Sequence, residues 1–259
     1  MLVPGSSPRR ILLINNMTAK SPRRPKLGIV QSRGLGDIVI ALPIAKFYHD
    51  QGWDCLWPIC SEFISHFEHT VPWIKWIPVQ TDPGSFFYDQ PMKALKNFHC
   101  DEIIPLYQAL TGHKFHEELY FQQTKFDQYK YIKAGVPFLN KWKLSECIQR
   151  DAQREQRLYD KIITNEKYAV VHLEGSDHTA NFDPSIIPSD WQTVYIKAET
   201  DSIFDWLKII EGAESLVMVD SVYSNLVDQL KIKTDKYFIP RSHVGLTPVH
   251  GMDWTWIKF

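Results

Sequence analysis

Short apolar runs alternate with longer amphipathic segments along most of the chain, the first typical of buried strands and the second of helices. In the first part of the chain this pattern predicts strands over 27–31, 55–59, 73–79 and 102–106. It predicts helices between them, over 38–51, 62–69 and 90–98. Strands and helices that alternate in this way indicate a layered α/β domain with a parallel sheet.

A second α/β series fills the last part of the chain, with strands predicted over 168–173, 193–197, 215–219 and 236–239 and helices over 202–212 and 224–230. The stretch between the two series becomes polar and helical, with helices expected over 124–134 and 147–163. We therefore expect a leader over 1–26, a first Rossmann-like domain over 27–138, a helical linker over 139–165, a second Rossmann-like domain over 166–240 and a tail over 241–259.

The loop after the first strand carries one acid, Asp37, immediately before a helix. Gly34 and Gly36 permit tight backbone turns and the close approach of a ligand, and Arg33 adds a positive charge. Free amides at the start of a helix favour negative charge, so Asp37 is expected to be ionised and able to act as a base. The alternative is that Asp37 simply caps the helix.

In doubly wound sheets, ligands bind beyond the carboxyl ends of the strands. Polar residues follow three predicted strands of the second series at such ends, namely His172, Glu174, Ser176, Asp177 and His178, then Glu199, and then Asp220 and Ser221 with Ser224 and Asn225 one turn further. Hydroxyls and amides from Ser221 onwards would suit a diphosphate, and Glu199 would suit ribose hydroxyls. The alternatives are helix capping for Asp220 and Ser221 and a solvated loop carboxylate for Glu199.

Two segments resemble the heptosyltransferase-like glycosyltransferases of family 9. The first is Ser32-Arg-Gly-Leu-Gly-Asp-Ile-Val-Ile-Ala-Leu-Pro43, which resembles their amino-terminal loop. The second is Ile210-Glu-Gly-Ala-Glu-Ser-Leu-Val-Met-Val-Asp-Ser221, which is similar to the segment leading to their donor-site Asp-Ser/Thr. Family members usually continue the second motif with a glycine and then a histidine, whereas this chain has Val222-Tyr-Ser-Asn225.

The resemblance implies a GT-B-like fold, in which two Rossmann-like domains with parallel sheets face a cleft and the tail packs back on the N-terminal domain. It implies that Asp37 is the base of an inverting, metal-independent glycosyltransferase. Such an enzyme moves a sugar from a nucleotide-sugar donor to an acceptor hydroxyl, with a saccharide as the favoured acceptor. The nucleotide-sugar is a substrate, so no cofactor is expected.

Three other functions stay open on the sequence. The first is a phage-type DNA glycosyltransferase that modifies a hydroxylated base, which the basic residues of the leader and the many tryptophans would suit. The second is a non-catalytic module that binds a nucleotide-sugar. The third, an NAD-dependent oxidoreductase, has weak support, because the loop at Gly34 supplies only the first two glycines of the dinucleotide fingerprint.

Composition narrows the class of protein further. The 29 basic and 30 acidic residues nearly cancel, so no overall field attracts nucleic acid or a membrane surface. No apolar run is long enough to span a bilayer, and no secretory signal pattern is present. Four irregularly spaced cysteines favour neither a disulfide framework nor a zinc site, and no Asp-x-Asp motif of metal-dependent glycosyltransferases occurs. A cytoplasmic protein without a bound metal is the expectation.

Overall fold

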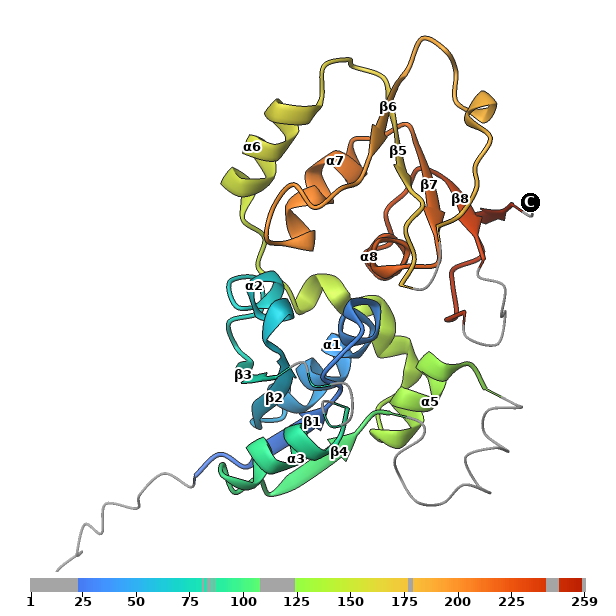
Figure 1. Ribbon diagram of the computed structural model, residues 1–259. Helices are drawn as coiled ribbons and strands as arrows, with labels where there is room; N and C mark the ends of the chain where they lie inside the picture. The colour runs from blue at the N-terminus through green and yellow to red at the C-terminus, as the bar shows by residue number, and fades with distance from the viewer. Residues whose placement is uncertain are drawn as a thin grey trace, which may run out of the picture.

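The structure, a computed structural model, describes residues 23–80, 82, 85, 87–107, 124–176, 179–240 and 247–257. Most of the expected leader, together with Asp177 and His178, lies outside these residues. The molecule is an α/β protein with two parallel sheets, as the alternation predicted (Figure 1). None of the described helices has both the length and the apolar character that crossing a membrane requires.

The first sheet has four parallel strands in the order β3-β2-β1-β4. They are β1 Lys26–Val30, β2 Asp54–Cys60, β3 Lys75–Val79 and β4 Glu102–Pro105, each close to a predicted strand. The helices of this part are α1 Leu35–Asp50, α2 Ile64–Phe67 after the 3-10 turn η1 Ser61–Phe63, α3 Asp89–Lys96 and α5 Phe126–Lys133. We call this part the first lobe.

Both faces of the first sheet are covered, which explains why its strands read as nearly continuous apolar runs. Leu27 and Ile29 pack on the face that α1 covers, and Val30 packs with Leu95 of α3 on the other. Gly28 permits this second contact, because a Cβ atom there would lie 2.8 Å from a methyl carbon of Leu95.

The second sheet has five parallel strands in the order β6-β5-β7-β8-β9. They are β5 Tyr168–His172, β6 Gln192–Tyr195, β7 Ser215–Val219, β8 Asp235–Ile239 and β9 Trp254–Trp256. Helix α7 Leu207–Glu211 extends the 3-10 turn η5 Ile203–Trp206, and α8 Val222–Gln229 follows β7. A loop with one 3-10 turn, η4 Pro184–Ile186, covers the face of the second sheet opposite these helices. The apolar side chains of this loop include Ile187 and Trp191.

The connection between the sheets differs from the expected linker helix. A long 3-10 segment, η3 Phe138–Glu146, packs against α1 and α8. Helix α6, Ala152–Ile162, begins later than the predicted 147–163, because the Asp151 carboxylate accepts hydrogen bonds from the backbone of Gln153 and Arg154 and caps it there. Helix α6 packs against α7 and η5 (Figure 1), so we group it with the second sheet as the second lobe.

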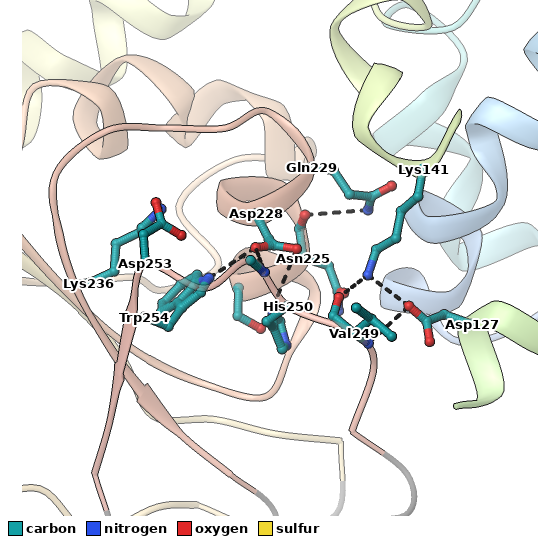
Figure 2. Close-up of polar contacts among 12 residues, drawn as sticks. Asp127, Lys141, Asn225, Asp228, Gln229, Lys236, Val249, His250, Asp253 and Trp254 are labelled. Atoms are coloured by element: carbon teal, nitrogen blue, oxygen red, sulfur yellow. Dashed lines mark hydrogen bonds and ion pairs between the residues drawn. The ribbon is translucent and has the colours of Figure 1, made fainter. Parts of the chain in front are cut away.

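The tail contacts both lobes. Its strand β9, which the sequence analysis does not predict, extends the second sheet, whereas the expectation placed the tail on the first domain. Before that strand, the backbone N–H of Val249 donates to Asp127 Oδ2 of α5 at 3.0 Å. Lys141 of η3 donates to the same carboxylate at 2.8 Å and to the carbonyl of Val249 (Figure 2). This buried ion pair therefore links α5, the connection and the tail.

Candidate active site between the two sheets

A cavity of about 850 Å³ lies at the carboxyl ends of strands from both sheets. Strand order reverses between β1 and β4 in the first sheet and between β5 and β7 in the second. Such reversals leave a crevice in which α/β proteins bind ligands. The carboxyl end of each of these four strands, or the segment after it, contributes a residue to the cavity lining, namely Asp37, Tyr107, His172 and Ser221 respectively. The fold thus brings both switch points to one space.

Most of the residues predicted from the sequence line this cavity. They are Arg33, Gly34, Gly36, Asp37, His172, Glu174, Ser176, Asp220, Ser221 and Asn225. Glu199 and Ser224 do not line it, and His178 lies outside the described residues.

Glu199 and Ser224 are held by partners elsewhere. Glu199 turns toward α6 and forms an ion pair with Lys161 at 2.7 Å, which lowers the pKa of the carboxyl. Ser224 is fully buried, and its hydroxyl accepts a hydrogen bond from the backbone N–H of Ser221 at 3.0 Å. Each therefore makes a contact within the protein, and its expected contact with a ligand stays a prediction.

Asp37 occupies the first turn of α1, at the edge of the cavity. Its side chain is 37% exposed, and Lys130 Nζ of α5 lies 3.1 Å from its Oδ1. Gly34, which precedes the helix, has φ +81, and a Cβ atom there would collide with Asp37 Oδ2. The glycine is thus required both for the backbone turn and for the position of the carboxylate.

His172 and Ser221 meet on the opposite side of the cavity. His172 ends β5, Ser221 caps α8, and Ser221 Oγ lies 3.0 Å from His172 Nδ1. Burial lowers the pKa of His172 to about 4, so the imidazole is neutral at neutral pH. Its ring also packs edge-on against Tyr223, with ring centroids 4.7 Å apart. These contacts hold the start of α8 against the end of β5.

Asn225 approaches the cavity from the first turn of α8. Its Nδ2 donates to the carbonyl of Ser221 at 2.8 Å, and its buried Oδ1 has no protein partner within the described part of the chain. A ligand hydroxyl or amino group that reaches this oxygen would satisfy it.

The sequence analysis missed two cations. Lys197 lines the cavity just beyond β6, which ends at Tyr195. The predicted strand ran to residue 197, so the prediction placed Lys197 inside the strand and not beyond its end. Its place beyond the carboxyl end of a strand is the signal that would have found it. Lys130 is buried in α5 and contacts Asp37 only in the folded chain, so no local pattern indicates its role.

Comparisons with known proteins place the fold. Neither a protein-family model nor a curated protein sequence matches the chain. Among solved structures, it is similar to E. coli heptosyltransferase WaaC with ADP-2-deoxy-2-fluoro heptose, at TM-score 0.53 and 12% identity over 90% of this chain and 93% of that one. It is also similar to a family 9 glycosyltransferase from Veillonella parvula, at TM-score 0.56 and 9% identity over 90% and 86% of the two chains.

E. coli ADP-heptose LPS heptosyltransferase II matches at TM-score 0.51 and 10% identity, over 91% of this chain and 90% of that one. The similarity covers nearly the whole of each chain, so it includes both sheets. At these identities it shows a common fold. The chain therefore has the α/β fold of the heptosyltransferase-like, family 9 glycosyltransferases.

Proposed function

We propose that this protein is an inverting, metal-independent GT-B-type glycosyltransferase that moves a sugar from a nucleotide-sugar donor to a hydroxyl of a saccharide acceptor. One observation carries the proposal. Asp37 at the start of α1 and Ser221 at the start of α8 follow strands of different sheets, and both line the same cavity. The first supplies a base, and the second begins a helix whose free amides attract an anion.

The donor diphosphate is assigned to the α8 side of the cavity. Val222 and Tyr223 at the start of α8 line the cavity, as does Lys197, and the start of a helix and a lysine side chain both favour negative charge. Preorganised donors of this kind stabilise charge that develops on a leaving group, each by about 3 kcal/mol. They offset the charge of the departing nucleoside diphosphate without a metal ion.

The acceptor is assigned to the α1 side. As the acceptor oxygen attacks the anomeric carbon, its proton passes to the Asp37 carboxylate. The bond between that carbon and the diphosphate oxygen breaks, and its electron pair leaves with the nucleoside diphosphate. Attack from the face opposite the leaving group inverts the anomeric centre. A base within hydrogen-bonding reach of the hydroxyl contributes about 10² to 10⁴ in rate.

The solved structures with this fold suggest the first donor to test. WaaC is described with an ADP-heptose analogue, and a second similar structure, TibC, is described in complex with ADP-D-beta-D-heptose. The replacement of the family's glycine and histidine by Val222-Tyr-Ser-Asn225 changes the wall next to the diphosphate. UDP- and GDP-sugars therefore belong in the same screen.

Calorimetric titration with ADP-, UDP- and GDP-sugars tests the donor site. We expect one class to bind, and the variant Lys197→Met to bind it at least tenfold more weakly. Lys208→Met is the matched control, because Lys208 of α7 hydrogen-bonds Gln156 and does not line the cavity. Binding of no nucleotide-sugar, or an equal loss in the two variants, would contradict the proposal.

A further inference from the structure

The Lys130 ammonium is held inside the first lobe by two hydrogen bonds and one ion pair. Its side chain is 3% exposed. Nζ lies 2.6 Å from Gln31 Oε1, 3.4 Å from the carbonyl of Leu106 and 3.1 Å from Asp37 Oδ1. Two of the three N–H donors of this ammonium are thus engaged by Gln31 and the carbonyl of Leu106, and it contacts Asp37 as an ion pair. The direction from which the ammonium approaches Asp37 is therefore fixed.

Gln31 makes the shortest of these three contacts, and two further hydrogen bonds hold Gln31 itself in place. It follows β1, it is fully buried, and its Nε2 donates to the carbonyl of Arg33 at 2.8 Å. Its own backbone carbonyl accepts a hydrogen bond from Trp57 Nε1 of β2 at 2.9 Å. Buried polar groups joined in this way have little freedom to move. The ammonium is thus anchored to the centre of the first sheet.

Lys130 contacts Asp37 without lining the cavity itself. The rings of Tyr107 and Phe126, which do line it, have their centroids 5.9 and 5.7 Å from Nζ. The lysine therefore acts on a ligand only through Asp37, whose side chain is 37% exposed and has the greater freedom.

We propose that Lys130 is a positioning residue that holds the Asp37 carboxylate through Oδ1 and leaves Oδ2 to take the acceptor proton. This proposal rests on the function proposed above. Without the ammonium, a half-exposed aspartate would turn among several rotamers, and a shift of about 1 Å in a reacting group costs about 10²-fold in rate. The cation also offsets the charge of Asp37 toward an anionic donor.

The experiment compares Lys130→Met, Asp37→Asn and the double variant in single-turnover reactions with labelled donor. We expect K130M to lower the transfer rate 10- to 100-fold while donor affinity stays within about twofold. In the D37N background the same change is expected to have no further effect, because the carboxylate that it positions is already gone. A merely structural lysine would lower the rate by the same factor in both backgrounds.

The matched control is Lys141→Met. Lys141 is also fully buried and also pairs with an aspartate, Asp127, but it lies away from Asp37. We expect K141M, assayed where it is folded, to keep the transfer rate. If K130M fails to fold, Gln31→Met takes its place, because it removes the side-chain oxygen that accepts a hydrogen bond from Lys130. We expect this variant to lower the transfer rate when Asp37 is present and to have no effect in D37N.

The outcomes separate the two proposals. A lower transfer rate in D37N with an unchanged rate in K130M would overturn the role of Lys130 but would not contradict the proposed transferase function. An unchanged rate in D37N, or no transfer by the unmodified protein with any nucleotide-sugar, would overturn the proposed function and this role with it.

Discussion

Gly36 in the first turn of α1 lies against Asn225 in the first turn of α8. A Cβ atom on the glycine would sit 3.4 Å from Asn225 Nδ2 and 3.6 Å from the backbone of Val222. The amino-terminal ends of two helices from different lobes therefore meet at the cavity. Each such end carries a partial positive charge, so both helix ends favour an anion in the cavity.

The position of the Asp37 carboxylate depends on Gly34. We predict that Gly34→Ala lowers the transfer rate at least 10²-fold, because the new methyl group collides with Asp37 Oδ2. The positive φ adds a backbone penalty of about 1–3 kcal/mol. Gly52→Ala is the control, since Gly52 also has positive φ, +91, but nothing lies within 4 Å of its Cβ position. If Gly34→Ala and Gly52→Ala lowered both the stability and the transfer rate by equal amounts, the collision with Asp37 would be unimportant.

The fully buried Lys141–Asp127 pair is predicted to be costly to break. Lys141→Met leaves the Asp127 charge uncompensated and should lower the free energy of unfolding by about 3–5 kcal/mol. Adding Asp127→Asn removes that charge but keeps an acceptor for the Val249 N–H, so K141M/D127N should be more stable than K141M. Urea denaturation measures both. A double variant less stable than K141M would contradict this reading of the pair.

Burial of His172 predicts a specific pH dependence. Its pKa falls from 6.5 in the unfolded chain to about 4 in the folded protein. Below pH 6.5 the unfolded state therefore gains a proton that the folded state does not accept until about pH 4, and stability falls as the pH drops through this window. At pH 5 the loss amounts to about 2 kcal/mol.

Denaturation at pH 7 and pH 5 measures this effect in the unmodified protein and in His172→Gln. The variant is expected to lose about 2 kcal/mol less over the interval, since it lacks the titrating group. His69→Gln controls for the removal of a histidine, because the His69 side chain is 78% exposed. Equal losses in the unmodified protein and in H172Q would show that His172 does not titrate as its burial implies.

Local sequence predicted the strands at the centre of both sheets because β1, β2, β5 and β7 are buried on both faces. It did not predict β9, whose three residues Trp254–Trp256 alternate over too short a distance and pair with β8 only in the folded chain. The helix expected at 147–163 was wrong at its start, because η3 and the Asp151 cap take the preceding residues.

The same limit applies to the site. The strand-end rule placed Asp37, His172, Asp220 and Ser221 correctly on one cavity, because the end of a strand is a local property. The direction of a side chain at that end depends on distant partners. Lys161 on α6 draws Glu199 away from the cavity, and Lys130 reaches Asp37 from α5. Neither pairing has a signature in the sequence.

The central claim is that Asp37 accepts the acceptor proton while the α8 side holds the donor. The most direct test measures donor affinity and transfer rate for Asp37→Asn beside the unmodified protein, with the donor that binds best. We predict a rate lower by about 10² to 10⁴ and a donor dissociation constant within about twofold. A D37N variant that transfers sugar at the unmodified rate, or that loses donor binding in parallel with activity, would contradict the claim.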